Sequence, residues 1–202
     1  MIITAEHIAT MEKLPKVQLA TSLPGAKPIC LVGTQSLAGI TNLAPFSSII
    51  HLGSSPMLIG MVTRPDTVDR NTLKNIIDTK SWTLNHVHKE ILEQAHQCSA
   101  RYPAEISEFT AVGMHEHFHP NISAPFVKES RIRYALDLED IVDIKTNNTK
   151  LIIGRVQIIE VPDNALLCDG SIDLIETASL ASTALDTYFS LSKVAQFDYA
   201  KP

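Results

Sequence analysis

The sequence lacks the features that define several classes of protein. Its longest apolar stretches, such as residues 57–62, fall far short of the roughly 20 residues that a helix needs to cross a bilayer. Its three cysteines, Cys30, Cys98 and Cys168, are widely spaced and form no CxxC pair. Neither a disulfide framework nor a cysteine zinc site is therefore predicted. We expect no membrane association and a reducing compartment.

We also expect neither a leader segment nor a basic nucleic-acid-binding surface. The first fifteen residues carry Glu6 and Glu12 and no long apolar block, so we expect no secretory signal and a cytoplasmic location. Lys and Arg number 17 against 22 Asp and Glu, which gives a net charge of −5. A mildly acidic chain without a dense basic cluster is poorly suited to a phosphate backbone. We expect no nucleic-acid partner, although a small anionic ligand remains compatible.

The common catalytic signatures are absent as well. The chain has no GxGxxG, GxxxxGK[ST], GxSxG or HExxH motif. NAD(P)H would have to bind without the usual dinucleotide fingerprint, and hydrolysis would need a nucleophile outside these motifs. A reaction driven by a cofactor is favoured.

The hydrophobic pattern that is present predicts a mainly β protein with peripheral helices. The chain has 202 residues, of which 45% are hydrophobic, so it can build one domain with a sizeable core. Short apolar runs and alternating patterns predict strands at residues 27–33, 37–50 (interrupted near Pro45), 56–63, 81–87, 131–139 and 151–161. Asn147-Asn148 predicts a turn that pairs the last two strands as a hairpin. Strands at this spacing favour an antiparallel barrel over a parallel doubly wound sheet.

Two helices are predicted between the strands. Residues 70–79 form a short helix capped by Asn71 or Thr72, with Leu73, Ile76 and Ile77 facing inward. Residues 88–100 form a second helix, whose apolar stripe indicates packing rather than chemistry. The amino end of the first helix is expected to be accessible.

Three histidines at two-residue spacing, His115, His117 and His119, would lie on one face of an extended segment and could hold a metal ion. The alternative is a solvated polar loop before Pro120, because no carboxylate or helical partner pattern stands nearby.

A stronger candidate site comes from three separate segments. Proline and small residues interrupt a strand at residues 41–48, which frees backbone groups that a flat polar heterocycle could satisfy. Thr63-Arg64 ends a strand, and Arg70-Asn71-Thr72 begins a helix, where free N–H groups and guanidinium groups suit a phosphate. Together they predict a mononucleotide site. Taken one at a time, the same residues could be a bend, a surface charge and a helix cap.

The order of these motifs resembles the flavin reductase-like, FMN-binding split-barrel family, which includes flavoredoxin-like flavoproteins. The resemblance rests on TNLAPFSSI, Thr63-Arg64, RNTLKNIIDTKSWTLNHV, Glu108-Phe109 with Gly113, APFVKES, GRVQIIEV and LDTYFSL, and it covers about residues 20–195 of a single domain spanning residues 1–202. The family typically has Lys-Asp-Thr where this chain has Arg70-Asn71-Thr72. The charge at the first position is kept, whereas Asn71 replaces an acid.

The resemblance implies an antiparallel split β-barrel that binds FMN. It places Asn42, Leu43, Ala44, Ser47 and Ser48 along the isoalloxazine, largely through backbone groups. It places Thr63, Arg64, Arg70, Asn71 and Thr72 at the phosphate end. It also implies a homodimer, to whose flavin site Tyr188 and Phe189 would contribute; the alternative is that this aromatic pair anchors a terminal element in the core.

The implied function is an NAD(P)H-dependent flavin reductase, in which hydride passes from the nicotinamide to flavin N5. No side-chain acid or base would be required, in agreement with the missing signatures. An electron-transfer protein with bound FMN, similar to flavoredoxin, is the main alternative. A metal-binding barrel that uses the three histidines is the other.

Overall fold

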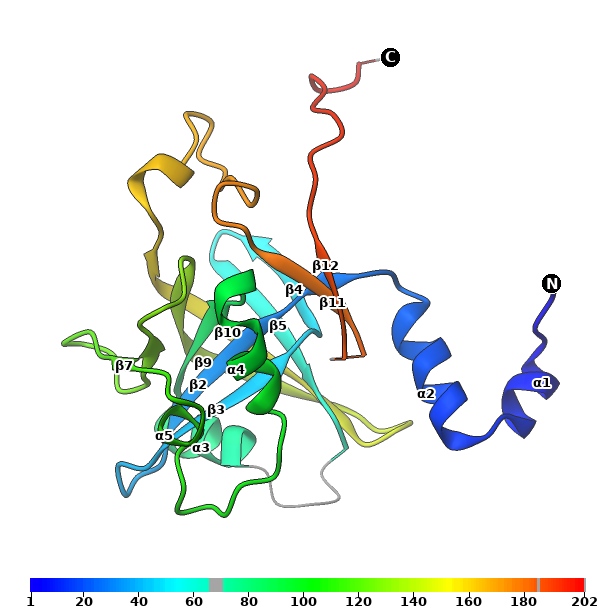
Figure 1. Ribbon diagram of the computed structural model, residues 1–202, viewed down its shortest axis with the longest axis horizontal. Helices are drawn as coiled ribbons and strands as arrows, with labels where there is room; N and C mark the ends of the chain where they lie inside the picture. The colour runs from blue at the N-terminus through cyan, green and yellow to red at the C-terminus, as the bar shows by residue number, and fades with distance from the viewer. Residues whose placement is uncertain (66–70, 185, 202) are drawn as a thin grey trace.

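The computed structural model describes residues 1–65, 71–184 and 186–201 (Figure 1). Its helical segments are α1 (Ala5–Thr10), α2 (Lys13–Ser22), α3 (Asn71–Thr79), η1 (Lys89–Ile91), α4 (Leu92–Gln97), α5 (Glu108–Val112) and η2 (Asp163–Ala165). Its strands are β1 (Lys27–Pro28), β2 (Cys30–Gln35), β3 (Thr41–Phe46), β4 (Ile49–Ser54), β5 (Met57–Thr63), β6 (Ser81–His86), β7 (Glu116–His117), β8 (Phe126–Val127), β9 (Arg133–Ile144), β10 (Thr149–Glu160), β11 (Leu180–Thr183) and β12 (Thr187–Ser190).

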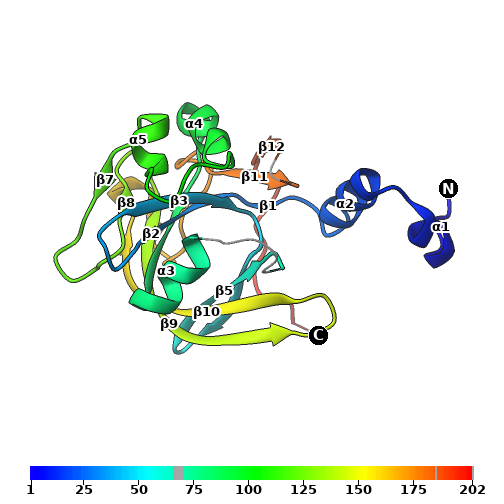
Figure 2. The same cartoon turned by 90° about the horizontal axis from the view of Figure 1, so that it is seen from below.

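A seven-stranded antiparallel sheet in the order β3-β2-β6-β9-β10-β5-β4 forms the body of the molecule. Its two edge strands, β3 and β4, are joined by only Ser47 and Ser48. Three peptide steps span at most about 11 Å, so the sheet has to curl until its edges nearly meet (Figure 2). The expected antiparallel barrel is therefore present as an open, curled sheet rather than a closed one.

The interior of the curled sheet holds one hydrophobic cluster, and α3 covers one opening of it. Trp82 from β6 and Ile152 from β10 are buried there together with Leu73 and Ile76 of α3. Ile77, which we expected to face inward, is 40% exposed. The reason is that Thr72 and Asn75 occupy the buried face beside Leu73 and Ile76, which turns the helix so that Ile77 points outward.

A second cluster lies on the outer side of β2 and β3, beneath α4, α5 and β11. It includes Leu31, Leu43, Val87 and Phe109, all of which are buried. The helix expected over residues 88–100 is present in two parts, η1 and α4, and its Ile91, Ala95 and Cys98 pack into this cluster. These elements therefore pack against one side of β3.

The interruption in the second predicted strand falls later than expected. Pro45 lies inside β3, and the chain leaves the strand at Ser47 and Ser48. Proline is tolerated in β3 because this is an edge strand, where a missing N–H does not break the ladder. The β9–β10 hairpin predicted around Asn147-Asn148 is confirmed, with β-bulges at Ile153/Gly154 and Val156/Ile158.

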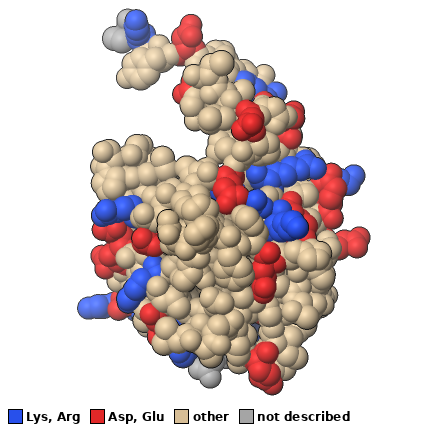
Figure 3. Space-filling model, turned by 90° about the vertical axis from the view of Figure 1, so that its left-hand side faces the viewer, with Lys and Arg blue, Asp and Glu red and all other residues tan. Residues whose placement is uncertain are grey.

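The two chain ends extend away from the sheet. Helices α1 and α2 stand beside the body in both ribbon views, and the residues after β12 run outward without regular structure (Figures 1 and 2). Neither α1 nor α2 has a buried residue. Among the described residues, no helix is long and apolar enough to span a membrane. On the face shown in Figure 3, positive and negative side chains are interspersed around a broad uncharged centre.

Candidate cofactor site

Two side-chain hydrogen bonds fix the start of α3 against β2 and β3. Asn42 Nδ2 donates to Thr72 Oγ1 at 3.0 Å, and Asn75 Nδ2 donates to Thr34 Oγ1 at 3.1 Å. All four residues are buried. The structure thus brings Asn42 and Thr72, two residues predicted for the site, into direct contact.

The link between β3 and β4 lies beside the end of β5. Ile49 pairs with Met61, and the N–H of Val62 donates to the carbonyl of Ser48 at 2.9 Å. Continuing this antiparallel register by one further place sets Ser47 next to Thr63. The first and second predicted residue groups therefore converge, with Arg64 exposed at their margin.

The free edge of β3 is closed in part by a buried carboxylate. Glu108, at the start of α5, accepts a hydrogen bond from the N–H of Leu43 at 2.9 Å and is only 8% exposed. Burial raises the pKa of Glu108, and the hydrogen bond from Leu43 opposes that rise. Burial and the charge of Glu108 together raise the pKa of Cys98 to about 12. The Leu43 N–H is consequently already used by Glu108 and is not available to a ligand.

Several polar side chains at the site have no partner within the described part of the chain. These are Ser47, Ser48, Arg64 and Asn71. Hydroxyl, amide and guanidinium donors beside the first turn of a helix are the groups that bind a phosphorylated heterocycle such as FMN. The donor set therefore fits FMN. Ala44, half-buried between Leu43 and Pro45, adds a small side chain on the same strand, whereas Arg70 lies outside the described residues.

Tyr188 and Phe189 lie apart from this donor set within one chain. The Tyr188 hydroxyl contacts His96 Nδ1 at 2.7 Å, and the two rings meet edge to face. Tyr188 also packs on the outer cluster beneath α4, while Phe189 is 43% exposed. Tyr188 thus anchors β12 to α4.

The three histidines His115, His117 and His119 do not share a common partner. His115 Nδ1 pairs with Glu129 at 2.6 Å, and His117 Nε2 lies 3.6 Å from Glu160. Nδ1 of His119 is buried without a partner. No group of three His, Cys, Asp or Glu side chains among the described residues is placed to hold a metal ion. The metal-binding alternative therefore has no geometric support.

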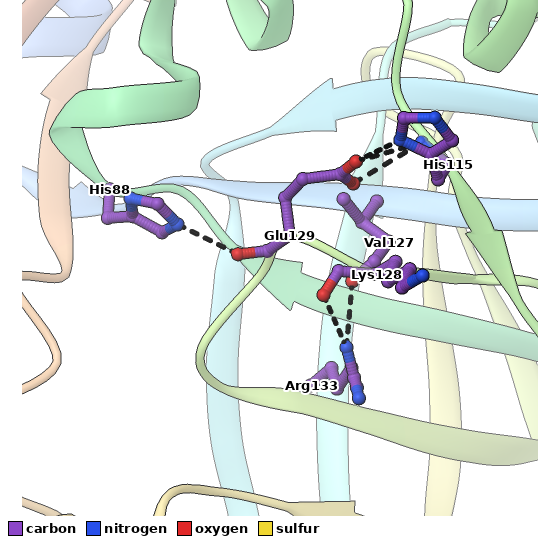
Figure 4. Close-up of polar contacts among 6 residues, drawn as sticks. All are labelled: His88, His115, Val127, Lys128, Glu129 and Arg133. Atoms are coloured by element: carbon purple, nitrogen blue, oxygen red, sulfur yellow. Dashed lines mark hydrogen bonds and ion pairs between the residues drawn. The ribbon is translucent and has the colours of Figure 1, made fainter.

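The segment around Val127–Glu129 is held by side chains from three directions (Figure 4). Arg133 Nη1 donates to the carbonyls of Val127 and Lys128, at 3.2 and 2.8 Å. The carbonyl of Glu129 lies 2.9 Å from His88 Nε2, and its carboxylate binds His115. These contacts fasten the APFVKES segment to the body of the protein, so its role in the sequence pattern is structural.

A hollow of about 540 Å³ opens at the start of β3. There the Thr41 hydroxyl contacts Ser107 Oγ at 2.6 Å and also donates to Glu116. The lining of the hollow combines acidic, amide, hydroxyl and apolar groups, which come from Gln35, Gly39, Ile40, Thr41, Glu105, Ile106, Ser107, Thr110, Glu116 and Phe118. None of the residues predicted to bind the cofactor lines this hollow.

Glu108 is the residue to which the sequence analysis assigned no role at the site. The pair Glu108-Phe109 was recognised as part of a motif. The signal that could have revealed its role was an acidic residue directly before an aromatic residue at the start of a helix. Its contact with Leu43 joins residues 65 positions apart, so spacing alone could not reveal it.

Comparisons with known proteins agree with this architecture. A crystal structure of a putative flavin reductase with a split barrel domain from Shewanella frigidimarina is 42% identical, with a TM-score of 0.95 over 99% of this chain and 100% of that one. Nitrilotriacetate monooxygenase component B from Bacillus cereus has the same fold, with 22% identity and a TM-score of 0.85 over 98% of both chains. An uncharacterized protein of Aquifex aeolicus is 30% identical over 77% of this chain and 78% of that protein.

The family comparison covers most of the curled sheet and the whole candidate site. The model of the flavin reductase like domain matches residues 25–172. This range includes β3, the Ser47-Ser48 link, the end of β5 and α3. The chain therefore belongs to the flavin reductase like domain family.

Proposed function

We propose that this protein is an FMN-dependent oxidoreductase that takes electrons from NADH or NADPH. FMN binds between the Asn42–Ser48 segment of β3, the end of β5 and the start of α3. The observation that carries the proposal is the convergence of these three segments, with the Asn42–Thr72 hydrogen bond at one end and the unpaired donors of Ser47, Ser48 and Arg64 at the other.

Each group of residues has a distinct task in this site. The chemistry supplied by bound FMN is hydride acceptance at N5 and transfer of electrons to an acceptor. Asn42 and Ala44 support the ring from β3, and Ser47 and Ser48 add hydrogen bonds at its edge. Asn71, Thr72 and the first turn of α3 hold the phosphate together with Arg64 and Arg70.

Glu108 positions β3, the strand that supports the flavin ring, by binding its free edge. Its carboxylate fixes the N–H of Leu43, so β3 keeps its register without a neighbouring strand on that side. No side-chain acid or base is needed for hydride transfer, so this positioning is the protein's main contribution. The functional unit is a homodimer.

An electron-transfer flavoprotein similar to flavoredoxin is the competing function, and one experiment separates the two. The freshly purified protein should show the absorption bands of oxidised flavin, and anaerobic NADH or NADPH should bleach them. Bleaching by dithionite but by neither nicotinamide would leave only the electron carrier. A colourless preparation that also fails to bind added FMN in calorimetry would refute both.

A further inference from the structure

The amino-terminal residues 1–24, here called the arm, expose apolar side chains that the described part of their own chain leaves uncovered. Leu14 is 77% exposed, Val17 47% and Leu23 78%. The ten-residue helix α2 buries none of its residues, and its N-cap Glu12 makes no side-chain cap bond. Isolated helices shorter than about 12–15 residues are marginal in water, so α2 requires packing against something. Two side-chain bonds link α2 to the strands among the described residues: Gln18 donates to Asp186 in the β11–β12 turn, and Lys27 of β1 donates to the carbonyl of Thr21.

A second apolar surface of the same chain is also uncovered. The register of β4, β5, β10 and β9 places one set of side chains on the outside of the curled sheet, here called the bare face: Ile50, Leu52, Val62, Val142, Ile144 and Leu151. Gly60 lies at its centre, where Ile50 and Leu52 approach the position of an absent Cβ to 3.1 Å. Ile50 is 46% exposed and Val142 43%. By contrast, α4, α5 and β11 cover the corresponding outer side of β2 and β3.

We propose that the arm of each subunit packs on the bare face of a second copy of this chain, so that the two subunits exchange arms. The proposal rests on the homodimer included in the proposed function and adds which segments hold it together. The chain carries both halves of a possible pair, a helix with exposed apolar side chains and an apolar sheet face. In a two-fold symmetric dimer the contact between an arm and a bare face occurs twice, once for each subunit.

The size of the arm and its position support this occupant. A stable interface uses about 20–30 residues on each side, and an arm of 24 residues together with the bare face is large enough to supply them. The arm and the tip of the β9–β10 hairpin lie on the same side of the molecule (Figure 1). The similarity to the Shewanella frigidimarina crystal structure extends over 99% of this chain at a TM-score of 0.95. A score this high requires the arm to occupy the same position relative to the sheet in both proteins. No residue of α1 or α2 is nevertheless buried against its own sheet.

The first test measures the association of full-length variants by sedimentation. The wild-type protein should sediment as a dimer of the 22.2 kDa chain. Leu14→Glu in the arm and Val142→Glu on the bare face should each raise the dimer dissociation constant at least tenfold. The matched control is Leu37→Glu, because Leu37 is 79% exposed and lies in the β2–β3 turn, away from both surfaces. A wild-type monomer at tens of micromolar, or equal effects of all three substitutions, would overturn the proposal.

The second test locates the arm directly by amide hydrogen exchange. If the arm packs on a partner, protection of residues 13–22 should fall on dilution below the dissociation constant, while protection of β2 and β6 should remain. Protection of the arm that does not change with dilution would show that it packs on its own subunit. FMN titration of the same samples separates the two proposals. A dimer with exchanged arms that binds no FMN refutes only the function, and an FMN-binding monomer refutes only the exchange.

Discussion

Arg64 is an exposed cation at the end of β5, next to the Ser47-Ser48 link. Replacement by Glu reverses its charge without disturbing any described contact. We expect FMN binding to weaken by about 1 to 3 kcal/mol, the range of a charge-assisted hydrogen bond. Calorimetric titration measures the change. Arg101→Glu is the control, because Arg101 is equally free of described partners but lies outside the site; equal losses in both variants would contradict the assignment.

His86 is a partly buried imidazole whose Nδ1 lies 3.1 Å from Ser179 Oγ. Burial lowers the pKa of His86 to about 4, from an ordinary value of 6.5. Between these values the unfolded chain binds the proton and the folded protein does not, so stability is lost as the pH falls. The loss reaches about 3 kcal/mol near pH 4.

Urea unfolding of the wild type and of His86→Gln, followed from neutral to acidic pH, measures this effect. The variant lacks the titrating ring and should lose less stability over the same pH interval. Parallel pH profiles for the two proteins would show that His86 does not carry the effect.

Gly154 lies where β10 passes the ring of Trp82. A Cβ at this position would approach Trp82 Cη2 to 2.4 Å and Leu136 Cβ to 2.9 Å. We expect Gly154→Ala to lower the free energy of unfolding by about 1–3 kcal/mol, the usual effect of overpacking. Gly53→Ala is the matched control, since the nearest atom to its new Cβ would be 3.5 Å away. Denaturant unfolding should distinguish the two variants, and similar midpoints would refute the expectation.

At the scale of elements, α3 is attached to the sheet through buried polar contacts as well as through its apolar face. Thr72→Val keeps the shape of the side chain but removes the acceptor of Asn42 Nδ2. We expect a loss of about 1–3 kcal/mol in stability, because a buried donor is left unsatisfied, and weaker FMN retention on dialysis. Thr79→Val, at the other end of the same helix, should leave FMN retention unchanged. If both variants retain FMN equally well, α3 does not contribute to the FMN site.

The strands and α3 could be predicted from the sequence because their signals are local. Alternation over residues 131–139 and the Asn147-Asn148 turn indicated the long hairpin, and the spacing of Leu73 and Ile76 indicated the buried face of α3. The order of strands in the sheet could not be predicted, since β3 and β4 are neighbours in sequence but occupy opposite edges. The outward turn of Ile77 depends on polar contacts of Thr72 and Asn75 with β2 and β3, which no pattern within the helix displays.

The candidate site was predictable as a set of segments but not as a set of contacts. The motif order predicted that the segments of Asn42 and Thr72 belong to one site, but not that these two side chains meet. The use of the Leu43 N–H by Glu108 likewise depends on a pairing between distant residues. The hydrophobic pattern of the uncovered arm likewise does not indicate which surface the arm packs against. Long-range pairing is the part of the fold that local patterns do not contain.

For the whole molecule, FMN that binds only the folded state should raise the free energy of unfolding. At a free concentration 100 times the dissociation constant the gain is about 2.7 kcal/mol. Urea unfolding with and without FMN measures it at a fixed protein concentration. Riboflavin, which lacks the phosphate, should stabilise less at the same concentration; equal stabilisation would show that the start of α3 and Arg64 do not hold a phosphate.

The Ser47-Ser48 link joins two sheet edges that share no ladder in the described residues. Small substitutions at this seam remove no side-chain hydrogen bond among the described residues, although Ser47 is only 8% exposed and has little room for a large side chain. Variation there can alter ligand preference while foldability is retained. A combinatorial library confined to the seam is accordingly the most economical starting point for directed evolution of this protein toward new electron acceptors.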